Sequence, residues 1–305
     1  MINYQDGRKN KYVAEKVMAK VFLVSACVSI AALLLIAFFL FASGMPAIAE
    51  IGLFNFLWGT RWAPMDASPY FGIRPMIVGS LITTSGAVLL GVPIGIFTSV
   101  FLAYICPKPI YVFLKPAVNL LAGIPSVVYG FFGMIVIVSM IRNLSLQLTG
   151  GGTGMSLLSA SILLSIMILP TIIAISESSI RAVPRSYYEG ALALGASHVR
   201  SVFSIIVPAA KSGIFASVIL GIGRAVGETM AVVMVAGNQP AMPRSPLFPL
   251  GMMRGGRTMT ANIVMEMGYA AQGIHRNALI ATGVVLFIFI LLINIVFNML
   301  NRKRR

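Results

Sequence analysis

The sequence contains few charged residues and few of the side chains that form catalytic or metal sites. Only 10% of its 305 residues are charged and 58% are hydrophobic, whereas about a quarter of the residues in soluble domains are charged. Two cysteines, Cys27 and Cys106, provide no disulfide framework. The low charge and the mean hydropathy of +0.93 exclude an ordinary soluble domain and predict an integral membrane protein.

Acidic residues are the scarcest of the charged groups. Eight Asp and Glu stand against 23 Lys and Arg, which gives a formal net charge of +15. A basic excess of this size can indicate nucleic-acid binding, but here the basic residues are scattered between apolar runs. They mark membrane topology instead, so we expect membrane lipid around the chain and no nucleic-acid partner.

Six apolar runs are long enough to cross a bilayer, which needs about 20 residues. The predicted spans cover residues 21–43, 78–105, 111–141, 155–178, 213–236 and 278–300. The third run is longer than one span requires, and we expect it to break at Gly123, Ile124 and Pro125 because proline interrupts a helix. The predicted fold is an all-α membrane protein with six transmembrane helices.

The Lys and Arg positions predict that both termini are cytoplasmic, because basic residues concentrate on the inner side of a membrane. The inner segments then carry fifteen of them: Arg8, Lys9, Lys11, Lys16, Lys20, Lys108, Lys115, Arg181, Arg185, Arg200, Lys211, Arg302, Lys303, Arg304 and Arg305. The outer segments carry seven: Arg61, Arg74, Arg142, Arg244, Arg254, Arg257 and Arg276. The two histidines, His198 and His275, fall on opposite sides and cannot share a site.

This topology divides the chain into four predicted segments. They are a cytoplasmic N-terminal segment at 1–20, the first transmembrane helix with a periplasmic segment at 21–77, a transmembrane domain at 78–300 with a cytoplasmic loop at 180–212, and a basic cytoplasmic tail at 301–305. The outer segments at 44–77 and 237–277 either bind a periplasmic partner or cap the helical bundle. The glycine-rich run at 150–154 is no Walker A motif, because no Lys follows a Gly anywhere in the chain.

The loop between the fourth and fifth spans has the sequence EGALALGASHVRSVFSIIVP, from Glu189 to Pro208. Small side chains at Gly190 and Ala191 would let a partner surface come close, and Gly195 permits a sharp bend between two short helices. Pro208 is expected to end one helix before the next span begins. We interpret the loop as a docking element; the alternative is an ordinary alanine-rich helical loop.

The fifth span contains two charged residues, Arg224 and Glu228, with Thr229 beside them. Their spacing of four residues predicts that Arg224 and Glu228 share one helix face. A charge within a span costs about 2.5–3.5 kcal/mol on insertion scales and usually faces a water-filled path or a partner. We expect Arg224 to contact a passing anion and Glu228 to orient it, and we place Thr229 on the same substrate pathway. The alternative is that the charges of Arg224 and Glu228 only neutralise each other and help to hold the helical bundle together.

Glycines four residues apart occur in two spans. Gly91 and Gly95 lie in the second, and Gly223 and Gly227 in the fifth. This spacing lets another helix pack closely against the backbone. Both pairs are therefore predicted to be helix-packing positions.

Two motifs resemble those of ABC importer permeases. The docking loop is similar to the EAA motif of these membrane subunits. It has Glu189, a small residue and Ala191 in succession, followed by Gly195 and, later, Pro208. The run GRAVGETMAVVMVAGN from Gly223 resembles Pst-type phosphate importer permeases more specifically. It is most similar to the PstC-type half; the alternative is the PstA-type half, which shares parts of these motifs. The segment GIPSVVYG at 123–130 is similar to the same family's signature. Gly190 and Val207 are mild departures from the EAA pattern, where Ala and Leu are usual.

The resemblance implies a type I importer for inorganic phosphate in the bacterial inner membrane. Its partners would be a PstA-type permease, two copies of a cytoplasmic PstB-type ATPase and a periplasmic PstS-type phosphate-binding protein. The EAA loop would lie in a groove of the ATPase, which would bind ATP and Mg, so this chain would need no cofactor and would be no enzyme by itself. The alternatives are a permease for another oxyanion, such as sulfate or molybdate, and, more distantly, an intramembrane enzyme.

Overall fold

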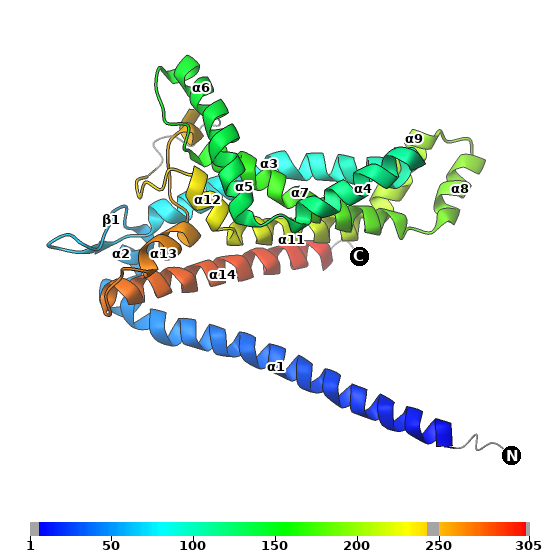
Figure 1. Ribbon diagram of the computed structural model, residues 1–305, viewed down its shortest axis with the longest axis horizontal. Helices are drawn as coiled ribbons and strands as arrows, with labels where there is room; N and C mark the ends of the chain where they lie inside the picture. The colour runs from blue at the N-terminus through cyan, green and yellow to red at the C-terminus, as the bar shows by residue number, and fades with distance from the viewer. Residues whose placement is uncertain (1–5, 243–249, 303–305) are drawn as a thin grey trace.

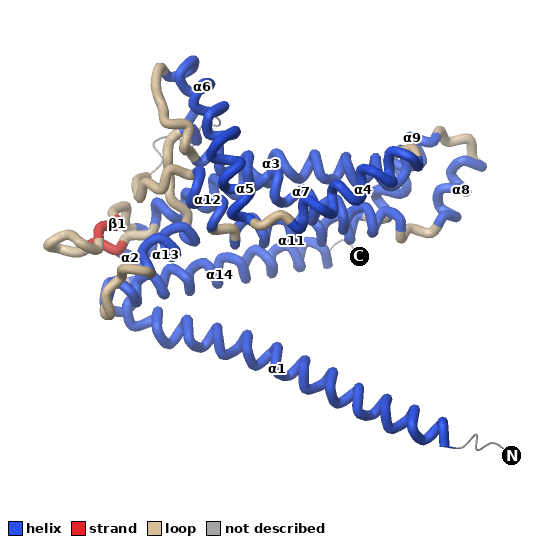
Figure 2. Tube along the Cα trace, viewed as in Figure 1, coloured by secondary structure: helices blue, strands red, loops and turns tan. Residues whose placement is uncertain are grey.

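The computed structural model describes residues 6–242 and 250–302; the rest, including most of the predicted basic tail, lies outside the described residues. Nearly all of the described chain is helical, with one short pair of strands (Figure 2). Most of the long helices run side by side between two ends (Figure 1). We call the end that carries the helices α8 and α9 the inner end, and the end that carries the strands β1 and β2 the outer end.

The N-terminal half runs from the inner end to the outer end, back to the inner end, and out again to α6 (Figure 1). Its elements are α1 (Asp6–Ile51), α2 (Leu53–Trp58), β1 (Trp62–Ala63), β2 (Tyr70–Phe71), α3 (Arg74–Val100), the π-helical turn η1 (Phe101–Ile105), α4 (Lys108–Gly123), α5 (Ser126–Phe132), the π-helical turn η2 (Gly133–Ile137) and α6 (Val138–Thr149). The two strands are antiparallel, with Trp62 opposite Phe71.

The C-terminal half crosses back through the bundle. Its elements are α7 (Leu157–Arg181), α8 (Arg185–Ala193), α9 (His198–Ser201), the π-helical turn η3 (Val202–Ile206), α10 (Val207–Ala209), α11 (Lys211–Gly227), α12 (Met230–Val235), the 3-10 turn η4 (Leu250–Met253), α13 (Met259–Met267) and α14 (Ile274–Arg302).

The described helices agree with six predicted membrane spans. Five are long and apolar enough by themselves, and the sixth is a pair, His198–Ala209 and Lys211–Gly227, bent by 69°. The predicted break in the third run is confirmed, because α4 ends at Gly123, Ile124 is extended and α5 begins after Pro125. The spanning helix there runs from Ser126 to Leu148, later than the predicted 111–141, since α4 forms a separate helix before the break.

The first span extends further outward than predicted. The helix α1 continues to Ile51 and does not end near residue 43. A Cβ placed on Gly44 would lie 2.9 Å from Val284 Cγ2, so the missing side chain lets α1 pack closely on α14. Phe41 and Phe287 meet edge to face near the same place. The rest of α1 diverges from the body of the molecule and leaves its apolar side chains exposed (Figure 1).

The helix α7 lies at the centre of the bundle, and glycines of its neighbours pack against it. A Cβ on Gly91 would lie 2.8 Å from Ile168 Cδ1, and one on Gly95 would lie 2.7 Å from Ile172 Cγ2. From the other side, a Cβ on Gly221 would lie 3.1 Å from Ile172 Cδ1. Because these glycines have no side chains, α3 and α11 approach α7 more closely than larger residues would permit.

The outer end is closed by a buried polar cluster around Glu266 of α13. The carboxylate accepts hydrogen bonds from Trp62 Nε1 at 2.9 Å and from Arg257 Nη1 at 2.6 Å, and it lies 3.0 Å from His275 Nε2. These contacts join the strand pair, the segment before α13 and the start of α14. Burial, and next the charge of Glu266, raise the pKa of the neighbouring Tyr269 hydroxyl, while Arg257 opposes the rise.

The predicted orientation can be tested with single cysteines at the two ends. Leu194 at the inner end is 92% exposed, and Met65, between β1 and β2 at the outer end, is 71% exposed. In a Cys27→Ser, Cys106→Ser background, Met65→Cys should react with an impermeant maleimide in intact spheroplasts. Leu194→Cys should react only after lysis, and the cysteine-free background should stay unlabelled. Labelling of Leu194→Cys before lysis would contradict the orientation.

Candidate functional site

The predicted docking loop forms two short helices at the inner end. The helix α8 ends at Ala193, α9 begins at His198, and Gly195 between them has a φ of +82°. Glycine adopts this left-handed conformation without the strain that most other residues incur, so Gly195 joins the two helices as expected. Ser197 caps α9, its hydroxyl accepting a hydrogen bond from the Arg200 backbone N–H at 3.4 Å.

The loop is fixed to the inner ends of the spanning helices. The Tyr188 hydroxyl lies 2.6 Å from His198 Nδ1, which ties α8 to α9, and the Tyr188 ring packs on Tyr104 of η1 at 5.4 Å. Beneath it a buried apolar cluster joins the ends of α3, α7 and α11 to η3: Val100, Ile180, Val183, Val202, Ile206, Ala210 and Ile214. A force on the loop is therefore transmitted to these helices through packed side chains.

The predicted docking residues do not all face outward. Glu189, Gly190 and Gly195 are exposed, but Ala191 is only 5% exposed and packs inside the loop. Its methyl group is therefore not offered to a partner, in contrast to the expectation from sequence. The side chain that projects most is Leu194, at 92% exposed. Pro208 lies in α10, directly before the 69° bend into α11.

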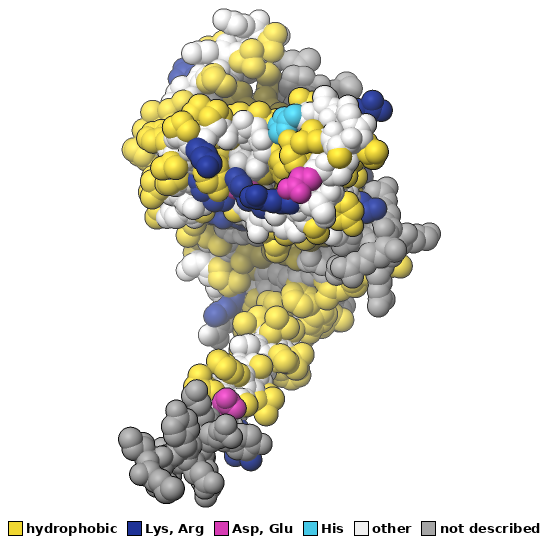
Figure 3. All heavy atoms as spheres, turned by 90° about the vertical axis from the view of Figure 1, so that its right-hand side faces the viewer, with side chains coloured by type: hydrophobic (Ala, Val, Ile, Leu, Met, Phe, Trp, Pro, Cys, Tyr) yellow, Lys and Arg dark blue, Asp and Glu magenta, His cyan; other side chains and the backbone are white. Residues whose placement is uncertain are grey.

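The surface around the loop is basic and partly apolar. Seen from the inner end, Lys and Arg side chains gather in a band across the molecule, with an acidic side chain beside it (Figure 3). Exposed hydrophobic side chains of the loop accompany the basic groups: Tyr187, Leu192, Leu194 and Val199. This combination suits contact with another protein better than contact with water alone.

The prediction that Arg224 and Glu228 share one helix face is wrong. The helix α11 ends at Gly227, Glu228 is extended with a ψ of 131°, and α12 begins only at Met230. The Glu228 carboxylate instead accepts a hydrogen bond from the Ala231 backbone N–H at 3.4 Å, at the start of α12. The Glu228 side chain therefore caps the start of α12 and does not bind Arg224, because an unpaired N–H at a helix start needs an acceptor.

Arg224 faces α7 and the start of α5. Its Nη1 lies 3.5 Å from Thr171 Oγ1, a long contact, and the guanidinium interacts electrostatically with the Tyr129 hydroxyl. In the part of the chain that the structure describes, no carboxylate forms a salt bridge with Arg224. Thr229, the third predicted pathway residue, donates from Oγ1 to the Gly227 carbonyl at 3.3 Å. The break thus places a cation within the span without a neutralising partner.

The four predicted packing glycines have different surroundings. Gly91 and Gly95 lie against α7, as described above. A Cβ on Gly223 or Gly227 would meet nothing within 4 Å. Close packing at these two positions would require another chain, and it stays a prediction.

A second charged cluster, which the sequence analysis did not identify, lies nearer the inner end. Glu177 of α7 is 2% exposed and accepts hydrogen bonds from Tyr111 Oη at 2.8 Å, Lys115 Nζ at 2.7 Å and Arg181 Nε at 2.9 Å. The available signal was a carboxylate within an apolar run, four residues before an arginine. Its partners on α4 could not be read from sequence, because they depend on how α4 packs.

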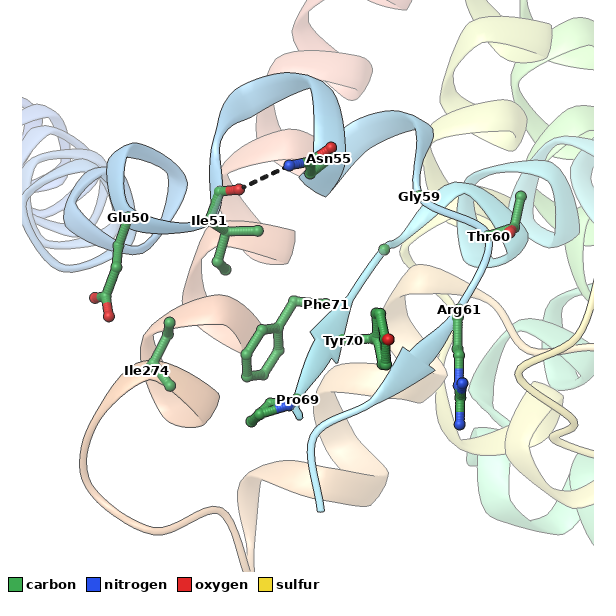
Figure 4. Close-up of a pocket in the computed structure, with 11 residues that line it drawn as sticks. Glu50, Ile51, Asn55, Gly59, Thr60, Arg61, Pro69, Tyr70, Phe71 and Ile274 are labelled. Carbon is green, nitrogen blue, oxygen red and sulfur yellow. Dashed lines mark hydrogen bonds between the residues drawn. The ribbon is translucent and has the colours of Figure 1, made fainter. Parts of the chain in front are cut away.

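A pocket of about 780 Å³ opens at the outer end, away from these charged groups (Figure 4). Glu50 lies on one side of it and Arg61 on the other, with Tyr70 and Phe71 between them. Arg61 is already bound to Asp66 at 2.6 Å. We assign no role to this pocket, since its two charged groups lie on opposite sides and share no contact.

Comparisons with known proteins identify the family. Residues 91–305 match the model of the binding-protein-dependent transport system inner membrane component family. The chain is 38% identical over 294 residues to the probable ABC transporter permease protein YqgH of Bacillus subtilis, covering 94% of this chain and 92% of the relative. It is 34% identical to the phosphate transport system permease protein PstC of Mesorhizobium japonicum, covering 85% of this chain and 81% of the relative.

Solved structures show the same fold at lower identity. The chain is similar to a bacterial alginate ABC transporter with a TM-score of 0.61 and 13% identity, covering 99% of this chain and 98% of that chain. It is also similar to the MetNI methionine ABC transporter, with a TM-score of 0.56 and 17% identity, covering 76% of this chain and 95% of that chain. The chain belongs to the binding-protein-dependent transport system inner membrane components, the multi-pass permease subunits of ABC importers.

Proposed function

We propose that this permease is the PstC-type subunit of an ATP-driven importer of inorganic phosphate. The names of several relatives at 31–34% identity support phosphate, and the unneutralised arginine in the fifth span supports an oxyanion substrate in general. The remaining alternative is another oxyanion such as sulfate or molybdate, because YqgH carries no substrate in its name.

The observation that carries the proposal is the position of Arg224. A guanidinium presents a planar set of donors that matches an oxyanion in a bidentate way. Arg224 lies one turn before a helix break, half-buried, with only the weak contact to Thr171 described above. An uncompensated charge within a span is costly unless a ligand or water reaches it. A passing phosphate would supply the missing negative charge.

The rest of the complex would supply what this chain does not contain. A periplasmic PstS-type protein would deliver phosphate, a PstA-type permease would complete the path, and two PstB-type ATPase subunits would bind ATP and Mg. Transport would proceed by alternating access. ATP would close the ATPase dimer, α8 and α9 would move with it, and the helices around Arg224 would open outward; hydrolysis would reset the cycle.

The loop is suited to act as a lever in this cycle. Leu194 and Gly190 would contact the ATPase, and the apolar cluster beneath Tyr188 would carry the movement to α11. The bend at Ala210 joins the loop directly to the helix that contains Arg224. One continuous segment of the chain thus connects the loop that would dock on the ATPase to the arginine that would contact the anion.

The lever role predicts a specific effect of the backbone at Gly195. Proline fixes φ near −65°, whereas Gly195 has a φ of +82°, so Gly195→Pro should misdirect α9. Phosphate uptake and co-purification of the ATPase should both fall by about tenfold or more, while the permease remains in the membrane. Gly195→Asn is the matched control, because Asn tolerates the left-handed region, and it should retain most activity. Normal uptake by Gly195→Pro would contradict the coupling role.

The substrate and the role of Arg224 can be tested together in proteoliposomes that contain the full complex and its binding protein. Uptake of phosphate should exceed that of sulfate. Arg224→Lys should lower phosphate uptake about tenfold, because lysine keeps the charge but loses the bidentate donors, and Arg224→Gln should lower it further. Thr171→Val removes only the long contact and should have little effect.

Two results would contradict this proposal. If the unaltered complex imports sulfate or molybdate and not phosphate, the substrate is wrong. If Arg224→Gln assembles with its ATPase and imports phosphate at the normal rate, Arg224 is not on the path.

A further inference from the structure

The cluster around Glu177 carries more positive charge than the buried carboxylate neutralises. Lys115 and Arg181 both form salt bridges to Glu177, at 2.7 and 2.9 Å. One carboxylate between two cations leaves a net charge of +1. In the described part of the chain, no second carboxylate forms a salt bridge with either cation.

The two cations keep hydrogen-bond donors for a further ligand. Lys115 has three N–H groups, and Nζ makes one hydrogen bond, to Glu177. Arg181 has five; it uses Nε for Glu177 and Nη2 for the Leu102 carbonyl at 2.7 Å. The Lys115 side chain is 26% exposed and that of Arg181 is 44% exposed, while Glu177 is 2% exposed. The accessible groups of the cluster are therefore cationic, and its anion is hidden.

The Glu177 cluster lies between α4 and α7, closer to the inner end than Arg224 does. Arg224 contacts α7 at Thr171, six residues before Glu177 and ten before Arg181. At 1.5 Å per residue, these positions lie about 9 and 15 Å closer to the inner end. The other end of α4 reaches the neighbourhood of Arg224, since Tyr129 donates to the Leu121 carbonyl at 2.8 Å. The same two helices thus connect Arg224 to the cluster.

We propose that Lys115 and Arg181 form a second oxyanion contact, through which the transported anion passes on its way from Arg224 to the cytoplasm. This inference rests on the proposed function. Along α7 the cluster lies about 9 Å (Glu177) to 15 Å (Arg181) from Thr171, beside which Arg224 lies, so the anion would leave one contact before it reaches the next. Glu177 positions both side chains and weakens their hold on the anion, so that the anion can leave. Lys and Arg side chains also gather on the face seen from the inner end (Figure 3).

A simpler role for the cluster is to fasten α4 to α7. The two roles differ in what they predict for anion binding. If the cluster only fastens the helices, replacing Lys115 affects assembly and leaves the affinity for phosphate unchanged. If it contacts the anion, the affinity changes while assembly persists. Because a lipid headgroup offers the same phosphate oxygens, the experiment must also separate the free ion from lipid.

The test is equilibrium binding of radiolabelled phosphate to the nucleotide-free complex of permeases and ATPase, in nanodiscs of phosphatidylcholine. Lys115→Met should raise the phosphate Kd roughly tenfold, the loss of one charge-assisted hydrogen bond. Lys115→Arg keeps the charge and should leave the Kd within about twofold, since the guanidinium offers at least as many donors. Glu177→Gln removes the competing carboxylate and should lower the Kd, a direction that a fastening role does not predict.

Several outcomes would overturn the inference. One is that the unaltered complex transports phosphate while the Lys115→Met and Glu177→Gln complexes assemble and bind phosphate with an unchanged Kd. In that case the cluster only holds α4 against α7. If Lys115→Met alters only the amount of phosphatidylglycerol that co-purifies, the contact serves a lipid headgroup. Failure of the proposed function looks different, because the unaltered complex would then import no phosphate.

Discussion

The close approach of α3 and α11 to α7 is the constraint on which the rest of the structure depends. A Cβ on Gly91 or Gly95 would clash with an isoleucine of α7 at under 3.0 Å, and one on Gly221 would lie tightly against Ile172 at 3.1 Å. Lipid is as apolar as these side chains, so helices in a membrane associate through such shape matching rather than through the hydrophobic effect. This packing sets where α11 runs, and therefore where Arg224 and the helix break lie.

The same packing explains how events at the two ends of the span can be connected. The docking loop, the apolar cluster beneath Tyr188 and the inner half of α11 form one continuous contact network. Closely packed interiors shift as units rather than deform gradually. A displacement of α8 and α9 is therefore expected to move α11.

Sequence patterns predicted the features that depend on neighbouring residues. The apolar runs indicated the spans, Gly123 and Pro125 indicated the break after α4, and Gly195 indicated the bend in the loop. The features that were missed or wrong depend on tertiary contacts. The helical spacing of Arg224 and Glu228 assumed an unbroken helix, yet the chain is extended at Glu228. Glu177 is bound by Tyr111 and Lys115 of α4, and Glu266 by Trp62 of β1; these partners lie far away in the sequence.

In the proposed cycle, ATP binding at the inner end changes access to the break beside Arg224. The most direct measurement is the rate at which Thr229→Cys, in a background without Cys27 and Cys106, reacts with a small charged thiol reagent applied from the cytoplasmic side. Thr229 is half-buried and lies within the break between α11 and α12. We expect fast reaction in the reconstituted complex without nucleotide and strong protection when ATP and Mg are bound. Equal rates in the two states would contradict it.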